Sequence, residues 1–398
     1  MQRSSLLSRL ALAAILLYFL GVLIFLGCSP DEFQWDFRTY YYAAQAFLQG
    51  QNPYPLETLK ALSGDRVQFR YVYPPLTLWV FTPFALLPFH SAAVVFLVLK
   101  AIVAAYLVRF WGTRFLQEPH WPLFVLFCLF GLNAPFYTDF SAGNISVFEQ
   151  LVLWAAFSFF LYGRYGMFCG LILIAASFKL LPLLFLALLL VTNHPRRYHL
   201  IALSTAVFAA SLVLTSLVSP ELFASFLDNL DQSPGRGIVN PSSLAFFTSA
   251  FDQLRAQTGL DLPPILPVLT YGVLVFGLLV IAVRTIRPHR SNRDPEVKVL
   301  VLFFLIVTSA LVLPRFKDYS FILLILPAYV MILRSHISSA PLLLILFVMP
   351  FHSALPGLVF VRSLANYSSL LLAGLLFYLY RREIRNSTSP LPIHAVQR

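Results

Sequence analysis

Charged residues are scarce in this chain of 398 residues: Asp, Glu, Lys and Arg together make up 11% of it. An ordinary soluble domain carries about 25%. A soluble fold of this length has too much surface to cover with so few charges. The composition therefore excludes a soluble enzyme, a disordered chain and a nucleic-acid-binding domain, and it indicates a protein that uses lipid as its solvent.

Cysteine and the common catalytic signatures are also scarce or absent. The three cysteines, Cys28, Cys128 and Cys169, are far apart and form no CxxC pair, so they predict neither a disulfide framework nor a zinc site. The sequence has no GxxxxGK[ST], GxSxG, HExxH or GxGxxG. Nucleotide-driven transport, serine hydrolysis and zinc proteolysis thus lack their usual signatures.

Hydrophobic residues, by contrast, make up 59% of the chain. A spanning helix needs about 20 apolar residues, and we expect an all-α polytopic membrane protein with about twelve such helices. Proline in the second candidate predicts a broken or re-entrant segment, while Lys179 and Pro182 predict that the sixth is bent or split. The candidate spans are 7–27, 74–89, 91–111, 121–135, 147–162, 166–192, 199–218, 263–284, 297–313, 319–334, 340–359 and 366–380.

Orientation follows from the clusters of Lys and Arg, which favour the cytoplasmic side. With twelve spans, the clusters at 196–197, 284–298 and 381–385 fall on one side together with Arg3 and Arg9. We therefore expect both termini in the cytoplasm of a bacterial-type plasma membrane, and chemistry on the outer face. The expected parts are a membrane module 1–218 with a first outer loop 28–73, a second outer loop 219–262, C-terminal helices 263–385 and a disordered tail 386–398.

The most informative segment lies in the first outer loop. Apolar and aromatic residues recur at helical spacing between Trp35 and Leu48, and Gly50 suits a helix end. We expect a short helix at the membrane interface, with its tyrosines at headgroup depth. Asp36 at its start is either an N-cap or a carboxylate that takes a proton from a hydroxyl, and the two roles are compatible.

Several short motifs follow one another along the chain: Asp36-Phe37-x-x-Tyr40, Gly50-x-Asn52-Pro53-Tyr54, Tyr73-Pro74-Pro75, Pro83-x-x-Leu86-Leu87-Pro88, Gly143-Asn144, Lys179-x-x-Pro182, Asn240-Pro241-Ser242-Ser243-Leu244 and Pro314-Arg315-x-Lys317-x-Tyr319. Together they resemble the motifs of glycosyltransferase family 87, which includes polyprenol-phosphate-mannose-dependent mannosyltransferases. The resemblance implies a GT-C fold with two large outer loops, in which about seven N-terminal helices precede the second. It also implies that Asp36 is the catalytic base.

The reaction implied is an inverting transfer of a sugar, mannose by resemblance, from a polyprenyl phosphate to a lipid or glycan acceptor. Such a hexosyltransferase needs cations for the leaving phosphate. The outer loops contain no Asp-x-Asp or Glu-x-Asp pair, so we expect no metal and no cofactor. The expected donor-phosphate or substrate-binding residues are Arg315, Lys317, Tyr319, Arg70, Tyr40, Asn240 and Lys179.

Each of these has a plainer interpretation. An arginine or lysine at the interface also lies near lipid phosphates, and lysines within spans, Lys100 and Lys179, more often extend to the interface. Two other functions stay open. A secondary transporter or flippase of a lipid-linked or small polar substrate would favour broken helices in two repeats, and a polysaccharide polymerase or ligase would also be polytopic.

Overall fold

The computed structural model describes residues 2–116, 119–230, 235–237, 239–290, 294–335, 340–348 and 366–386. Within these ranges the chain is helical and forms no β-strand; an isolated bridge joins Gly237 and Asn240. The expected all-α class is therefore confirmed. Residues 387–398 of the expected disordered tail and the second half of the expected span 340–359 lie outside the described residues.

The chain divides into two units, each assembled from two stretches of sequence. The first comprises residues 1–108 and 137–233, and the second comprises 109–136 and 234–398. The first contains α1 (Gln2–Cys28), α2 (Trp35–Leu48), α3 (Leu56–Ser63), η1 (Pro75–Thr77), α4 (Leu78–Ala85), most of α5 (Phe89–Phe115) and of α7 (Pro135–Ala142), α8 (Ser146–Leu161), α9 (Tyr165–Ala176), η3 (Leu181–Val191), α10 (Arg197–Val218) and α11 (Pro220–Leu230).

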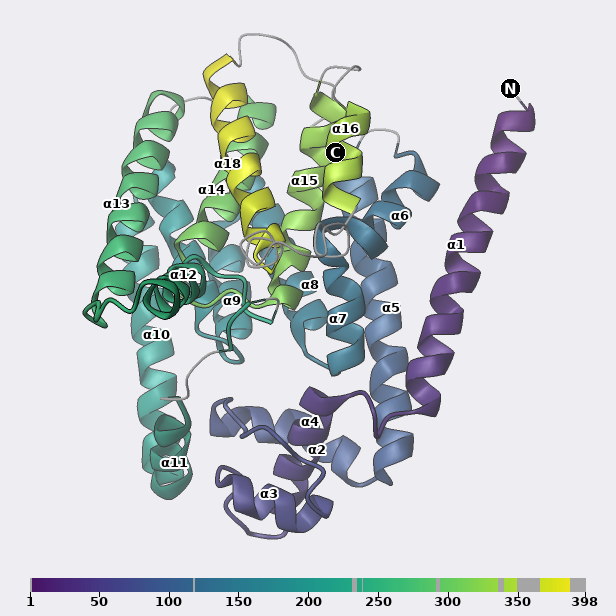
Figure 1. The fold of residues 1–398 in the computed structure, drawn as a ribbon, viewed down its shortest axis with the longest axis vertical. Helices are drawn as coiled ribbons and strands as arrows, with labels where there is room; N and C mark the ends of the chain where they lie inside the picture. The colour runs from purple at the N-terminus through teal and green to yellow at the C-terminus, as the bar shows by residue number, and fades with distance from the viewer. Residues whose placement is uncertain are drawn as a thin grey trace. The chain divides into compact units, whose positions relative to one another are not determined.

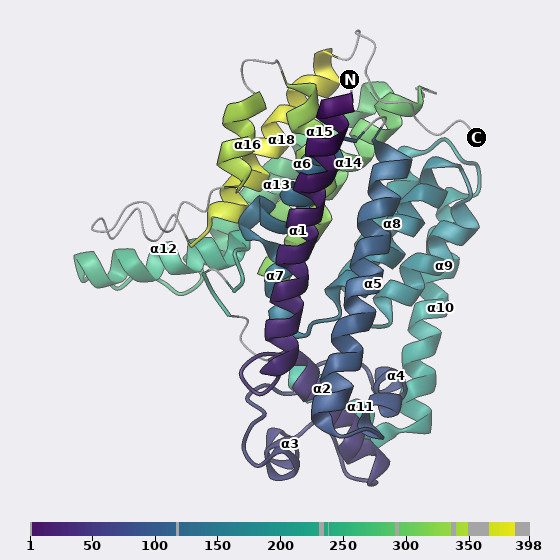
Figure 2. The ribbon, with the colours of Figure 1, turned by 90° about the vertical axis from the view of Figure 1, so that its right-hand side faces the viewer.

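The second unit contains the remaining helices. These are α6 (Trp121–Phe130), η2 (Gly131–Asn133), α12 (Ser243–Thr258), α13 (Leu266–Ile286), η4 (Arg287–His289), α14 (Pro295–Val312), η5 (Asp318–Phe321), α15 (Ile322–Arg334), α16 (Ala340–Val348) and α18 (Ser368–Asn386). In this unit α12 lies across the direction of α14 and α15 (Figure 2). The buried Ser242 begins α12, because its hydroxyl accepts a hydrogen bond from the N–H of Ala245.

Among the described residues, five helices are long and apolar enough to cross a membrane. They are α1, α5, α10, α13 and α14, and the bent pair formed by 121–133 and 135–142 raises the number to six. The other apolar helices are shorter, so the expected count of twelve is not confirmed. The break within the bent pair is local: Leu132, Asn133 and Ala134 all have left-handed φ angles, and a proline follows them.

The expected break in 166–192 is confirmed. Helix α9 ends at Ala176, and the 3₁₀ segment η3 begins at Leu181. Proline at position 182 suits the first turn of η3, where an N–H would have no intrahelical partner. Lys179 lies in the break itself, so its side chain leaves the backbone where the helix stops.

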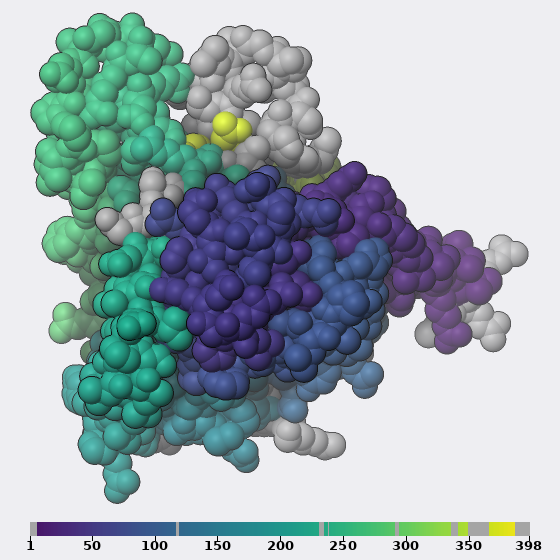
Figure 3. Space-filling model, turned by 90° about the horizontal axis from the view of Figure 1, so that it is seen from below, coloured from purple at the N-terminus to yellow at the C-terminus, as the bar shows by residue number. Residues whose placement is uncertain are grey.

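Within the first unit, the segments of the first outer loop gather at one end of the long helices. Figures 1 and 2 both place α2, α3 and α4 at this end, together with α11. Figure 3 shows the same face, on which the α2–α3 segment lies beside α11. The side-chain amide of Asn229 in α11 donates hydrogen bonds to the carbonyls of Tyr54 and Tyr71, at 2.8 and 3.0 Å. These bonds attach α11 to the first outer loop.

The three tyrosines of α2, which the sequence predicts at headgroup depth, differ in their exposure. Tyr40 and Tyr41 are buried inside the protein. They pack with Phe37, whose ring stacks on that of Phe96 in α5 at 4.4 Å. Aromatic side chains supply large apolar areas for such a core, so the loop has its own hydrophobic centre. The turn after α2 is as expected: Gly50 has a φ of 71°.

Candidate active site

Asp36 lies in the first turn of α2, but it is not the N-cap. The helix begins at Trp35, and its N-cap is Gln34, whose φ is 58° and whose side chain makes no capping bond. The capping role expected for Asp36 is therefore wrong. Its half-buried carboxylate is instead bound by the chain more than 100 residues later, because Asn144 Nδ2 donates to Asp36 Oδ2 at 2.6 Å.

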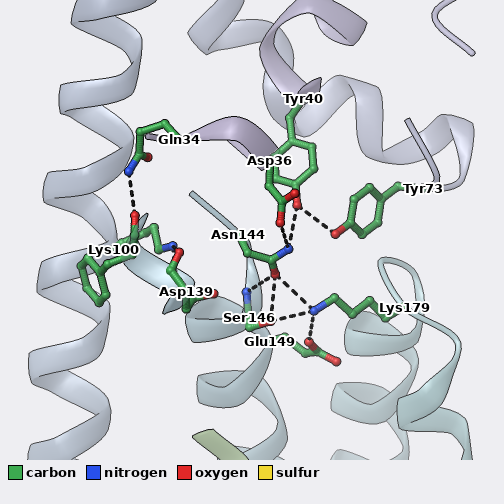
Figure 4. A network of polar contacts seen from close by, with 11 residues as sticks. Gln34, Asp36, Tyr40, Tyr73, Lys100, Asp139, Asn144, Ser146, Glu149 and Lys179 are labelled. Carbon is green, nitrogen blue, oxygen red and sulfur yellow. Dashed lines mark hydrogen bonds and ion pairs between the residues drawn. The ribbon is translucent and has the colours of Figure 1, made fainter. Parts of the chain in front are cut away.

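Asn144 is the centre of a polar network (Figure 4). Its Nδ2 also donates to the hydroxyl of Tyr40 at 3.1 Å. Its Oδ1 accepts from the backbone N–H of Ser146 at 3.0 Å and from the Ser146 hydroxyl at 2.8 Å. These hydrogen bonds join α2 to the start of α8, and Asn144 itself is buried, with 1% of its surface exposed.

The hydroxyls of Tyr40 and Tyr73 are 2.9 Å apart and share a hydrogen bond. Burial, with the nearby carboxylate of Asp36 as a smaller cause, raises the pKa of Tyr73 far above its usual range. The pKa values of Tyr54 and Tyr71 are raised as well, chiefly by burial. These phenols stay protonated at neutral pH, so they orient partners but do not act as bases.

Lys179 enters the network from the break between α9 and η3. Its ammonium donates to Ser146 Oγ at 2.7 Å and to Glu149 Oε2 at 2.8 Å, and it lies 3.4 Å from Asn144 Oδ1. Glu149 thus has a cation beside it. By contrast, Asp36 forms one hydrogen bond and no ion pair within the described parts of the chain. The two carboxylates therefore differ in the partner that holds one of their oxygens: an ammonium for Glu149 and a neutral amide for Asp36.

The turn that carries Asn144 is held from both sides. Gln34 donates from its backbone N–H to Ser141 O at 2.7 Å and from its side chain to Phe140 O at 2.6 Å. On the other side, Lys100 in α5 forms an ion pair with Asp139 in α7 at 2.9 Å. Both side chains of this pair are fully buried. The expectation that Lys100 extends to the interface is therefore wrong, because a buried partner is at hand.

Gly143 allows this turn to approach α2 closely. Its φ is 67°, and a Cβ there would lie 2.7 Å from Gln34 Oε1 and 2.7 Å from Phe37 Cβ. Gly163 has a similar φ of 71° but nothing within 4 Å of an added Cβ. An alanine at Gly163 would therefore show the free-energy cost of the left-handed conformation alone, and an alanine at Gly143 would show that cost together with the cost of the clash.

We expect Gly143→Ala to lower both stability and any activity that depends on Asp36. The left-handed conformation alone costs about 1–2 kcal/mol with a side chain, and the clash would also displace Asn144. Gly163→Ala should show only the first cost. Thermal unfolding of the two purified variants in detergent checks this. Equal losses in stability would contradict the close approach of the turn to α2.

Arg70, also expected to bind substrate, lies in the same unit as Asp36 but outside the network of Asn144. Its exposed side chain is 3.4 Å from Asn229 Oδ1 in α11. Asn229 in turn supports the carbonyls of Tyr54 and Tyr71. Arg70 therefore lies on the outer surface of the first loop, next to α11.

The remaining candidates belong to the second unit. Asn240 is fully buried, and its Oδ1 accepts from the backbone N–H of Phe316 at 3.1 Å, so it supports the segment 314–319. Arg315 is exposed, while the Lys317 ammonium lies 5.3 Å from the centre of the Tyr319 ring. Within the first unit the structure thus brings Asp36, Tyr40 and Lys179 into one network, and within the second unit Asn240 supports the segment that carries Arg315, Lys317 and Tyr319.

Four members of the network were not singled out as site residues from the sequence: Asn144, Ser146, Glu149 and Tyr73. Asn144 appeared only within a short motif. A signal for the group was present, because Ser146 lies two residues after Asn144 and Glu149 lies within one helical turn of Ser146. Among the described residues, no group of three or more His, Cys, Asp or Glu side chains could hold a metal ion.

The apolar helices define a multi-pass membrane protein, and the site combines a half-buried carboxylate with an oriented amide. The sequence model of glycosyltransferase family 87 matches residues 71–314, more than half of the chain. The protein belongs to glycosyltransferase family 87 and is a membrane glycosyltransferase. The matched range includes Asn144 and Lys179 and begins after Asp36. No curated protein and no solved structure matches the chain.

Proposed function

We propose that this glycosyltransferase moves a sugar, mannose by family resemblance, from a polyprenyl phosphate to the hydroxyl of a lipid or glycan acceptor. The observation that supports it best is the Asp36 carboxylate. It is half-buried, lies in a segment between two candidate spans, and has one oxygen held by Asn144. A carboxylate in this state can accept a proton from an acceptor hydroxyl.

The proposed reaction is a single displacement. Asp36 removes the proton of the acceptor hydroxyl while the acceptor oxygen attacks the anomeric carbon. The bond from that carbon to the phosphate oxygen breaks, and the polyprenyl phosphate leaves with the electron pair. The configuration at the anomeric carbon inverts, because one displacement occurs and no glycosyl–enzyme forms.

The leaving phosphate gains negative charge, so cations stabilise the transition state. In the unit that holds Asp36, Lys179 and Arg70 are the proposed candidates. Lys179 is bound to Glu149, whereas Arg70 is exposed with a weak contact to Asn229. Arg315, Lys317, Tyr319 and Asn240 stay predictions from the sequence.

The GT-C fold, the outer-face location of the reaction and the cytoplasmic termini belong to the same proposal. The family match supports glycosyl transfer over the transporter, flippase and polymerase alternatives. The lipid-linked donor is supported by the resemblance alone.

The proposal is tested by the choice of donor. The protein, purified and returned to lipid vesicles with a membrane lipid extract, is given radiolabelled mannose either on a polyprenyl phosphate or on a nucleotide. We expect labelled product only with the lipid-linked sugar. Transfer from the nucleotide sugar alone would contradict the proposed lipid-linked donor. Faster transfer from a different lipid-linked hexose would contradict mannose as the transferred sugar.

A further inference from the structure

The orientation of the Asn144 side chain is fixed by its neighbours. A backbone N–H and an ammonium can only donate, and both the Ser146 N–H and Lys179 Nζ face Asn144 Oδ1, at 3.0 and 3.4 Å. The Nδ2 group must therefore face Asp36 and Tyr40. Nδ2 also donates to the Tyr40 oxygen, and the Tyr40 hydroxyl shares a hydrogen bond with that of Tyr73.

The donors then form a chain that runs in one direction. Lys179 Nζ donates to Ser146 Oγ at 2.7 Å, Ser146 Oγ donates to Asn144 Oδ1 at 2.8 Å, and Asn144 Nδ2 donates to Asp36 Oδ2 at 2.6 Å. Hydrogen bonds aligned in this way polarise one another, the more so where water is excluded. Ser146 and Asn144 are buried, so the chain runs through the interior and ends at the half-buried carboxylate.

We propose that Asn144 is a positioning residue that holds Asp36 Oδ2 so that Oδ1 is open to the acceptor hydroxyl, and that Lys179 and Ser146 fix the orientation of Asn144. This inference rests on the proposed function and adds to it a residue that acts through Asp36. Asn144 touches neither substrate nor reacting atoms in this scheme.

The charged groups around Asp36 come from several elements. Lys100 in α5 and Asp139 in α7 lie within electrostatic reach, as does Tyr73. Lys179 and Glu149 lie on the far side of Asn144. In both ion pairs a carboxylate accompanies the lysine, and the direct contact of the Asp36 carboxylate is the hydrogen bond from Asn144.

The test is Asn144→Asp, which keeps the shape of the side chain. Aspartate can still accept from the Ser146 N–H and from Lys179, but it has no N–H to donate and it places a second carboxylate beside Asp36. We expect kcat/KM for transfer from polyprenyl-phosphate-mannose to fall about tenfold to hundredfold at neutral pH. We also expect the acid limb of the pH profile to move to higher pH, because like charges favour protonation.

Asn52→Asp is the matched control in the same unit. Asn52 has the same local arrangement: its Oδ1 accepts from the N–H two residues later, of Tyr54, at 3.1 Å, and its Nδ2 donates to Ser225 Oγ at 2.8 Å. Asn52→Asp therefore removes one amide donor, as Asn144→Asp does, but the partner of that donor is a hydroxyl and not a carboxylate. Its acid limb should stay where that of the wild type lies.

If Asn144→Asp does not fold, the rate and pH profile of Ser146→Ala test the same inference. It removes the hydroxyl from the chain but leaves the bond from Asn144 to Asp36. We expect a loss of less than about tenfold and a shift of the acid limb in the same direction, because only the relay from Lys179 is broken. A pH profile unchanged in both folded variants would overturn the inference.

A direct readout separates this inference from the proposed function. The carboxyl stretch of protonated Asp36 can be isolated as an infrared difference against Asp36→Asn, in the wild-type and the Asn144→Ala backgrounds. We expect the band to appear at higher pH in the second background, and the same pH in both would overturn the inference. If Asp36→Asn alone loses activity, while Asn144→Asp behaves as wild type, the proposed function stands and the positioning role does not. Equal transfer by wild type and Asp36→Asn would overturn both.

Discussion

Asp36→Asn is expected to lower kcat/KM for sugar transfer by about 10²- to 10⁴-fold, the range that a positioned general base contributes. The new amide keeps an oxygen that can accept from Asn144 Nδ2, whose present contact is 2.6 Å. The helix α2 should therefore stay in place while the proton acceptor is lost. Initial rates at saturating acceptor, with thermal unfolding measured in parallel, check both halves of this expectation.

Asp65→Asn is the control for this variant. Asp65 is exposed, with a φ of 61° in the turn after α3, and asparagine tolerates that conformation. We expect wild-type rates from it. A folded Asp36→Asn variant with near wild-type turnover would remove Asp36 from the reaction and direct attention to Glu149, the other carboxylate of the network.

Lys100→Met is expected to destabilise the protein by about 3–5 kcal/mol, since it leaves a buried carboxylate without its cation. The Lys100 ammonium lies 2.9 Å from Asp139 Oδ2 and donates to Asp139 O at 2.5 Å. It also lies 5.1 Å from the centre of the Phe140 ring. Reversible unfolding in bicelles or mixed micelles gives the free energy of unfolding.

The double variant Lys100→Met with Asp139→Leu tests whether the pair is the cause. Replacing both charges should restore most of the lost stability, because neither is then left unpaired. Lys60→Met is the surface control: its side chain and that of its partner Glu57 are 35% and 84% exposed, and such pairs contribute little. If the double variant were as unstable as the single one, the ion pair would not be what holds α7 against α5.

The sequence was enough to predict the helical class and the importance of the region around Asp36. Composition and apolar runs depend on local sequence alone, and so does the break at 177–180, which Lys179 and Pro182 signal. The resemblance of short motifs to glycosyltransferase family 87 also depends on sequence order, and the family match over 71–314 confirms it.

The hydrogen-bond partners could not be predicted in this way. The contact of Asp36 with Asn144 spans 108 positions, and that of Lys100 with Asp139 spans 39. Such distant pairs carry no periodic signal, so Asn144 appeared only as part of a motif. The wrong expectation for Lys100 has the same origin, since a lysine in an apolar run extends to the interface only where no buried partner exists.

One local prediction failed because the fold outweighed a sequence preference. Aspartate near a helix start is a good N-cap, yet the left-handed Gln34 places the start of α2 one residue before Asp36. Tyrosines favour membrane interfaces, and this preference alone did not predict that Tyr40 and Tyr41 are buried in the aromatic centre of the first loop. In both cases contacts with distant parts of the chain, which the local sequence does not show, set the surroundings of the residue.

The stereochemistry of transfer tests the central claim most directly. A donor of known anomeric configuration, labelled with ¹³C at the anomeric carbon, is given to the wild-type protein in vesicles. The one-bond carbon–hydrogen coupling of the product then reports its configuration. Inversion is expected if Asp36 acts as the base in a single displacement. Retention would require a second displacement and a nucleophile on the enzyme, and it would contradict that role for Asp36.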